Sequence, residues 1–281
     1  MKRALVVQPG KMGDIILTTP IAEYYSNQGY SIDWPVWDNF ISFFDAIDCV
    51  NPLSCNMKFP PDYHTPTQRY AFGRGDVLFI FDKIKYLISD GNYDLIINPC
   101  FSFGRSAVIS MENERMAEKF KVEGKNWIDL KYHLANVPLG ERWNFKWKRN
   151  PQKEDELLKM IKDFSKKKYG SDEYSLIHNY EKTFRIKSID NLKNPIYFSY
   201  IEGYEIYDWY KVIQEARNLV ACDSCLVHFI EVVPEFKNKK KYYVGTEEPH
   251  RNEYMRNILV NGWTNLSDVD ISYGGFNPWA K

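Results

Sequence analysis

Short apolar runs alternate with amphipathic stretches along the first part of the chain. The apolar run from Arg3 to Gln8 predicts a strand, and Pro9 and Gly10 predict a turn after it. Apolar residues at three- and four-residue steps over 15–25 then predict a helix. The further elements expected are strand 31–36, helix 39–47, a Pro-rich loop or lid over 51–68, helix 77–89 and strand 93–98. This alternation predicts a parallel, doubly wound sheet.

The second half of the chain repeats this rhythm after a charged helix expected at 153–168. Its expected elements are strand 175–178, strand 196–201, helix 207–216, strand 218–222, helix 226–233 and strand 241–245. The segment 144–153 is basic and polar, which predicts a domain boundary near 142–152. The expected fold class is therefore α/β, with two Rossmann-like doubly wound domains at 1–147 and 148–260. We expect the aromatic-containing tail, 261–281, to pack back on the first domain.

Composition agrees with two ordinary folded domains and excludes several classes of protein. The chain has 281 residues, and domains average roughly 150 residues. Hydrophobic residues make up 44% and charged residues 26%, which excludes collagen-like and disordered chains. The formal net charge is +0, so any binding of a polyanion must be local. The apolar runs are too short for a membrane span or a signal segment, which predicts a cytoplasmic protein without integral membrane contact.

The cysteines indicate neither a disulfide framework nor a complete metal site. The chain has 5 Cys, an odd number in a chain long enough to build cores without cross-links. Cys222, Cys225 and His228 together resemble half of a zinc site. Because no second Cys or His pair follows at a suitable spacing, we expect no metal and interpret these cysteines as small buried residues.

The first predicted strand-to-helix junction carries a candidate catalytic residue. Its sequence, from Pro9 to Asp14, has neither the dinucleotide-binding nor the P-loop spacing of glycines. Backbone amides and the positive end of the helix would still face a ligand there, with Lys11 and Gly13 as candidate contacts for acceptor or phosphate groups. Asp14 at this edge of a parallel sheet could act as a general base. The alternative is an N-cap that satisfies helix amides.

A second junction in the other half has the same design. Asp223 and Ser224 follow a predicted strand and begin a helix. The Ser224 hydroxyl and the helix amides could hold a diphosphate, and His228 would lie one turn into the helix on the same side. Simple helix capping is again the alternative.

Four segments, taken in order, carry a resemblance to a known family. They are Gly13–Pro20 after the first strand, Tyr93–Asn98, the Asp-Ser-x-Leu-x-His pattern of 223–228, and Tyr243–Thr246 followed by Pro249. Together they resemble the ordered motifs of the ADP-heptose:lipopolysaccharide heptosyltransferase family, from about residue 3 to residue 250. The resemblance implies a GT-B glycosyltransferase, with two Rossmann-like domains facing across a cleft and no metal cofactor.

The resemblance also assigns roles to residues of this sequence. Asp14 matches the family's catalytic base, and Asp223, Ser224 and His228 match its donor-binding motif. Cys225 stands where the family has glycine, which could crowd the nucleotide. Further donor-binding residues implied by position are Thr246, in a Gly-x-Thr loop, and Lys187, for which Lys182 and Arg185 are competing candidates. The donor would be a nucleotide-diphosphate sugar, and the chain is shorter than typical members.

The acceptor is open between two partners, of which we favour a hydroxymethylated base in DNA, with a surface-glycan sugar as the alternative. Lys146, Lys148 and Arg149 alternate with aromatic residues, as on surfaces that bind nucleic acids or phosphorylated glycans; solvated charges around a linker are the alternative. A composition rich in Tyr, Asn and Lys is typical of bacteriophage proteins, which favours a flipped 5-hydroxymethylcytosine in phage DNA as the acceptor, within the host cytoplasm. The family resemblance favours a lipopolysaccharide core or other surface-glycan sugar. A non-catalytic module that binds sugar nucleotides is a third hypothesis.

Overall fold

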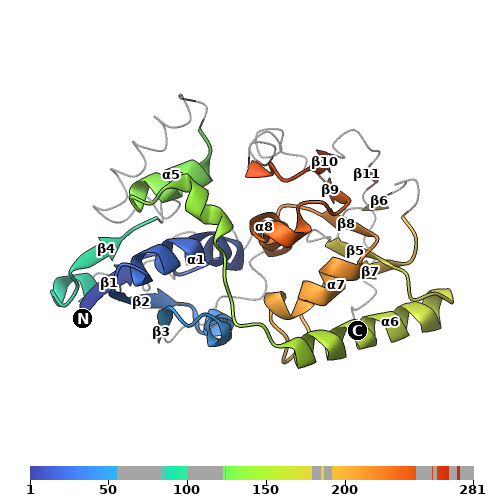
Figure 1. Ribbon diagram of the computed structural model, residues 1–281, viewed down its shortest axis with the longest axis horizontal. Helices are drawn as coiled ribbons and strands as arrows, with labels where there is room; N and C mark the ends of the chain where they lie inside the picture. The colour runs from blue at the N-terminus through green and yellow to red at the C-terminus, as the bar shows by residue number, and fades with distance from the viewer. Residues whose placement is uncertain are drawn as a thin grey trace. The chain divides into compact units, whose positions relative to one another are not determined.

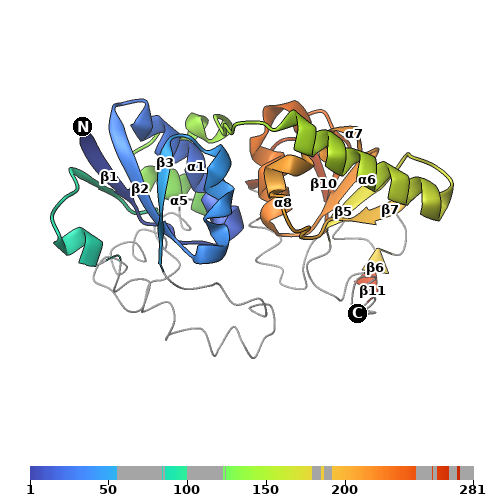
Figure 2. The ribbon, with the colours of Figure 1, turned by 90° about the horizontal axis from the view of Figure 1, so that it is seen from below.

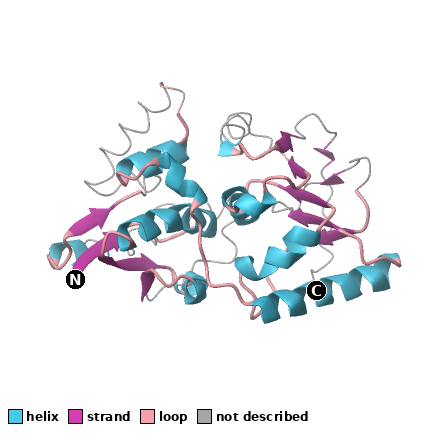
Figure 3. Cartoon of the chain, viewed as in Figure 1, coloured by secondary structure: helices cyan, strands magenta, loops and turns pink. Residues whose placement is uncertain are grey.

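A computed structural model describes residues 1–55, 84, 86–99, 123, 125–178, 185–186, 192–244, 255, 258–265 and 271–272. The chain divides into two compact units, Met1–Lys148 and Arg149–Lys281. Figures 1 and 2 show strands and helices in both units, and Figure 3 colours them by type. The division lies one residue beyond the boundary expected between 147 and 148.

The N-terminal unit is built on a four-stranded sheet with the order β3-β2-β1-β4. All three strand pairs in this sheet are parallel. Its strands are β1 (Lys2–Val6), β2 (Tyr30–Val36), β3 (Val50–Ser54) and β4 (Leu95–Ile97). Its described helices are α1 (Met12–Ser26), α5 (Trp127–Leu134) and the 3-10 helices η1 (Asp38–Phe40), η2 (Ser42–Ala46) and η3 (Leu139–Trp143).

Helix α1 is buried along most of its length because it packs against both the sheet and α5. The Tyr132 hydroxyl on α5 donates a hydrogen bond to the Leu17 carbonyl at 3.2 Å. In the other direction, the Tyr25 hydroxyl of α1 donates to the Ala135 carbonyl, just after α5, at 2.6 Å. These two bonds fix α5 beside α1, which determines where the side chains of α5 reach.

Three expectations for this unit need correction or cannot be assessed. Residues 50–54 form the strand β3, where the sequence predicted the start of a loop. The strand lies at the edge of the sheet, so the amide hydrogen that Pro52 lacks is not needed for a hydrogen bond to a further strand. Residues 38–46 form two 3-10 helices, with successive i to i+3 bonds such as Phe44 N to Ile41 O, instead of an α-helix. Of the helix expected at 77–89, only 84 and 86–89 are described, and they are helical.

The C-terminal unit contains a five-stranded parallel sheet with the order β10-β9-β8-β5-β7. Its strands are β5 (Ser175–His178), β7 (Pro195–Tyr197), β8 (Asn218–Ala221), β9 (Lys241–Tyr243) and β10 (Trp263–Asn265). Its described helices are α6 (Pro151–Tyr169), α7 (Tyr210–Glu215), α8 (Cys225–Val232) and the 3-10 helices η4 (Ile206–Trp209) and η5 (Pro234–Phe236). Across the described ranges, no helix combines the length and the apolar character needed to cross a membrane.

The described part of the 261–281 segment belongs to the C-terminal unit, whereas the sequence predicted packing on the first domain. Strand β10 pairs with β9, and β11 (Ile271–Ser272) pairs antiparallel with β6 (Arg185–Ile186). The buried carboxylate of Glu231 explains this placement. It accepts hydrogen bonds from the Trp263 indole at 2.8 Å and from the Val260 amide at 3.0 Å, and so holds the segment against α8.

A charged cluster on the N-terminal sheet makes stability depend on pH. Burial alone would raise the pKa of Asp33, but hydrogen bonds from Asn51, Arg3 and Tyr93 outweigh it and hold the pKa below its usual 3.8. Because the unfolded chain then binds a proton more readily, this contribution is complete above about pH 4 and is lost as pH falls through the lower, folded pKa. We expect Asp33→Asn to be less stable than wild type near neutral pH, with a difference that shrinks below about pH 4. Urea unfolding at several pH values measures this difference; a gap that stays constant down to pH 2 would contradict it.

Candidate functional site

The turn between β1 and α1 places Asp14 at the carboxyl edge of the N-terminal sheet. Lys11 is the N-cap of α1, in extended backbone, and Gly13 lies in the first helical turn. Asp14 occupies the third helical position, so the alternative that it is the N-cap is wrong. Its side chain is 25% exposed, which leaves the carboxylate accessible to a ligand.

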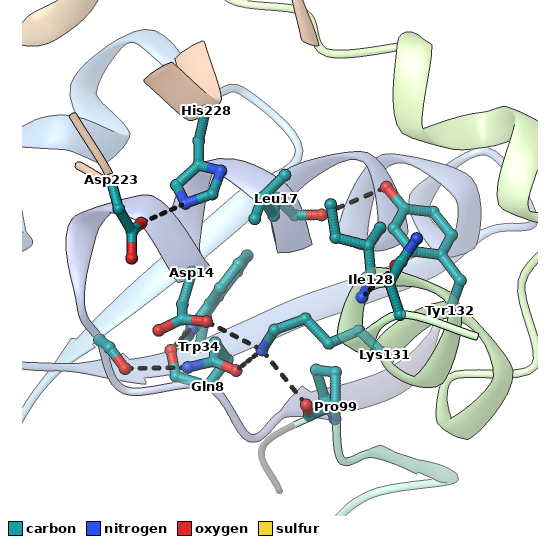
Figure 4. A network of polar contacts seen from close by, with 12 residues as sticks. Gln8, Asp14, Leu17, Trp34, Pro99, Ile128, Lys131, Tyr132, Asp223 and His228 are labelled. Atoms are coloured by element: carbon teal, nitrogen blue, oxygen red, sulfur yellow. Dashed lines mark hydrogen bonds and ion pairs between the residues drawn. The ribbon is translucent and has the colours of Figure 1, made fainter. Parts of the chain in front are cut away.

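A buried lysine holds the Asp14 carboxylate (Figure 4). Lys131 Nζ lies 3.2 Å from Asp14 Oδ1, and its side chain is 2% exposed. The same ammonium donates to Gln8 Oε1 at 2.5 Å and to the Pro99 carbonyl at 3.3 Å. Gln8 in turn donates from Nε2 to the Gly10 carbonyl at 2.8 Å. The ammonium therefore joins α1, the β1–α1 turn and the residues after β4.

Sequence reasoning missed both α5 and Lys131. The available signal was a capping box: the Asn126 side chain accepts from the amides of Ile128 and Asp129, and the Asp129 side chain accepts from the Asn126 amide. An Asn followed three residues later by an acidic residue, before an apolar pattern, marks a helix start. A lysine within such a helix reads as a solvent-facing residue, so the sequence alone did not indicate its contact with Asp14.

The second junction, between β8 and α8, places Ser224 at the N-cap of α8 in extended backbone. Its hydroxyl does not cap the helix. Instead, Ser224 Oγ donates to the Cys222 carbonyl at 3.0 Å and lies 2.8 Å from Nδ1 of His178. The first-turn amides of α8 therefore have no partner in the Ser224 side chain, which suits them to an anion such as a diphosphate.

His178, the last residue of β5, is a part of this junction that the sequence did not reveal as functional. Burial lowers its pKa to about 3, so the ring is neutral at physiological pH. The ring also packs edge-on against Phe198, with centroids 4.8 Å apart. The signal that could have found it is its place at the carboxyl end of a parallel strand, where such sheets bind ligands.

The remaining donor residues of the predicted motif lie close to this junction. His228 Nε2 is 3.7 Å from Asp223 Oδ1, with side chains 7% and 18% exposed, respectively (Figure 4). The pair shields the Asp223 charge only when His228 is protonated. Burial raises the pKa of the Cys225 thiol to about 12, so this cysteine stays protonated and is a poor nucleophile or metal ligand. Within the described residues, no group of His, Cys, Asp or Glu side chains has the arrangement of a metal site.

The basic residues predicted to contact the acceptor do not form one patch with Asp14. Lys146 pairs with Glu23 at 3.3 Å, in the second half of α1 and roughly 13 Å along the helix from Asp14. Arg149 forms a two-point ion pair with the buried Glu154 and stacks 3.8 Å from the Tyr210 ring centre. The exposed Lys148 donates its amide to the Ala46 carbonyl at 2.7 Å. These contacts favour the alternative of charges around a linker.

Two predicted donor residues lie outside the described residues. These are Lys187 and Thr246, together with the competing Lys182. Arg185 falls in β6, for which only the backbone is described. Their proposed contacts with donor phosphates therefore remain predictions from the resemblance.

No protein-family model and no curated protein matches the chain. Among solved structures, it is similar to a glycosyl transferase family 9 protein from Veillonella parvula DSM 2008, at 9% identity over 94% of this chain and 86% of that chain, with a TM-score of 0.50. It is also similar to E. coli heptosyltransferase WaaC with ADP-2-deoxy-2-fluoro heptose, at 12% identity, with 88% and 90% covered and a TM-score of 0.41. The first likeness and the parallel sheets of both units confirm the predicted fold class, a Rossmann-like α/β fold of the GT-B type.

Proposed function

We propose that this chain is an inverting glycosyltransferase that moves a sugar from a nucleotide-diphosphate sugar to an acceptor hydroxyl. The observation that carries the proposal is the Asp14 carboxylate. It is accessible, lies at the carboxyl edge of a parallel sheet, and is held by a buried ammonium. A module that only binds sugar nucleotides would not need a carboxylate fixed in this way. The fold shared with a family 9 glycosyl transferase supports the same assignment.

In the proposed mechanism, the two junctions serve the two substrates. Asp14 accepts the proton of the acceptor hydroxyl while that oxygen attacks the anomeric carbon. The bond from the anomeric carbon to the diphosphate breaks, and its electron pair leaves with the diphosphate on the opposite face, so the anomeric configuration inverts. The amides at the start of α8 stabilise the departing charge. Lys187 is the basic side chain proposed to assist them.

For the acceptor, we propose a sugar hydroxyl of a surface glycan, such as a lipopolysaccharide core, over a hydroxymethylated base in DNA. Binding of duplex DNA relies on several phosphate contacts from Lys and Arg. Two of the three basic residues predicted for that role, Lys146 and Arg149, are paired with carboxylates of the chain itself. A glycan acceptor bound through hydrogen bonds to its hydroxyl groups does not depend on such contacts.

Mass spectrometry of transfer products tests the proposal directly. The full chain is incubated with a panel of ADP-, UDP-, GDP- and CDP-sugars and with two acceptors, truncated lipopolysaccharide and hydroxymethylcytosine DNA. A sugar added to the lipopolysaccharide, absent with Asp14→Asn, is the expected result. A sugar found on a nucleoside after DNA digestion would show that the acceptor is DNA and not a glycan, and it would leave the proposed glycosyl transfer standing. Donor binding without transfer or donor hydrolysis would favour the binding module.

Ser224→Ala is expected to raise the dissociation constant of the donor about tenfold, the scale of one lost hydrogen bond to a charged group. The Ser224 hydroxyl is bonded to Cys222 and His178, so its loss also loosens the turn that presents the α8 amides. Calorimetry with the donor found in the panel measures the change. Ser171→Ala, which removes a hydroxyl bonded to the Glu173 amide in the same unit, is the matched control. Equal donor affinity for both variants would place the diphosphate elsewhere.

A further inference from the structure

Lys131 is buried to an extent that is unusual for a lysine. Its side chain is 2% exposed, on a helix whose neighbouring Ile128, Leu130 and Tyr132 are also buried. Removing an ammonium from water is strongly unfavourable unless the charge is paired and its protons are bonded. Replacing such a buried ion pair with apolar residues is often neutral or stabilising. A role in packing alone therefore gives a weak reason for a charged side chain at this position.

Three oxygens of the described residues lie around the Lys131 ammonium. One oxygen belongs to the Asp14 carboxylate, and the other two are neutral, the Gln8 amide and the Pro99 carbonyl. Gln8 is itself fully buried, and its main-chain carbonyl accepts a hydrogen bond from the Trp34 indole at 2.7 Å. Figure 4 shows these side chains converging on Nζ from separate elements. The ammonium is thus fixed in place independently of Asp14.

The ion pair also distinguishes the two oxygens of Asp14. Oδ1 faces Lys131, whereas Oδ2 makes no hydrogen bond or ion pair within the part of the chain that the structure describes. Holding one oxygen restricts the rotation of the carboxylate and leaves the other oxygen to a ligand. A group that takes a proton from an acceptor must sit within hydrogen-bond distance of it, and small displacements reduce the rate strongly.

We propose that Lys131 is a positioning residue for the Asp14 base, an inference that rests on the proposed glycosyl transfer. Lys131 holds Oδ1 so that Oδ2 receives the acceptor proton. When Asp14 takes the proton in that step, Lys131 keeps its hydrogen bonds to Gln8 and Pro99, so its side chain stays fixed through the cycle. The proton moves from the acceptor oxygen to Asp14, and Lys131 neither gives nor takes one.

Lys131→Met, Asp14→Asn and the double variant that combines them test this role. Lys131→Met removes the charge and keeps the length of the side chain. We expect Lys131→Met to lower kcat by roughly 10- to 100-fold with little change in donor affinity. Because the substitution leaves the buried Gln8 side-chain oxygen and the Pro99 carbonyl without this donor, we also expect a lower Tm, and kcat is measured well below that Tm. Lys125→Met, which removes an exposed lysine paired with Glu123 just before α5, is the matched control and should keep wild-type kcat.

Thermal unfolding of the variants tests whether Asp14 and Lys131 interact, independently of any effect on kcat. Asp14→Asn removes the carboxylate that pairs with the buried ammonium and should lower Tm by about 6 °C or more. The double variant Asp14→Asn with Lys131→Met should lose less Tm than the sum of the two single variants, while remaining inactive. Additive Tm changes would overturn the ion pair. Full kcat in Lys131→Met would overturn the positioning role while leaving the proposed function intact. A wild-type chain that neither transfers nor hydrolyses any donor in the panel would overturn the proposed function, and the positioning role with it.

Discussion

The Asp14→Asn variant is expected to lower the turnover of sugar transfer by about 10² or more, while the dissociation constant of the donor changes little. The amide keeps the size of the carboxylate but cannot accept the acceptor proton, so the rate loses the contribution of a general base. The donor is assigned to the other unit, which explains why its affinity should persist. Single-turnover kinetics with the donor and acceptor identified by mass spectrometry measures the chemical step directly.

The comparison must separate lost activity from lost folding, because Asn also removes the ion pair between Asp14 and Lys131. Rates are therefore measured well below the Tm of the variant, with the folded fraction followed by circular dichroism. Asp45→Asn, which neutralises an exposed carboxylate of the same unit, is the matched control and should keep wild-type turnover. Turnover near the wild-type value in folded Asp14→Asn would mean that another group accepts the proton, and the proposed mechanism would be wrong.

Local patterns were enough to predict the two junctions that carry the candidate residues, one in each unit. An apolar strand, a turn with Gly or Asp, and a helix with three- and four-residue spacing are encoded within about 20 consecutive residues. For this reason α1 with Asp14 and α8 with Ser224 lie close to their expected positions. The edge strand β3 was missed because Pro52 weakens the strand signal, and only the strand order shows that its missing amide is tolerated.

Contacts between distant residues could not be predicted from one sequence. Lys131 and its partner Gln8 are separated by 123 positions, and nothing in either local pattern indicates the other. The same limitation applies to the lysines near η5, which look like a basic patch in sequence. Lys239 Nζ donates to the carbonyls of Gln214 and Ala216, and Lys241 Nζ donates to Phe236 O and Lys237 O. Ammonium groups that the sequence alone would place in solvent therefore donate hydrogen bonds to carbonyls at the ends of helices.

The turn that presents Asp14 also has a strict requirement for glycine. Gly10 has a φ of +156°, and a Cβ at this position would lie 2.8 Å from Phe40 Cε2 and 2.9 Å from Trp37 Cδ1. The Trp37 ring is 3% exposed, and the Trp37 amide donates to the Pro9 carbonyl at 3.3 Å, so this aromatic wall cannot move freely. Gly10→Ala is therefore expected to lower the free energy of unfolding by about 2–4 kcal/mol, from backbone strain and overpacking together.

Two other glycines separate those contributions when urea unfolding is measured on all three alanine variants. Gly29 has a φ of +86° with nothing within 4 Å of its Cβ position, so Gly29→Ala reports backbone strain alone and should lower the free energy by about 1 kcal/mol. Gly140 also has open space and no such φ, so Gly140→Ala should be nearly neutral. If Gly10→Ala is no less stable than Gly29→Ala, the Phe40 and Trp37 rings move to make room for the methyl group at little energetic cost. In that case the turn, and with it the first turn of α1, would be held less rigidly than the positioning of Asp14 requires.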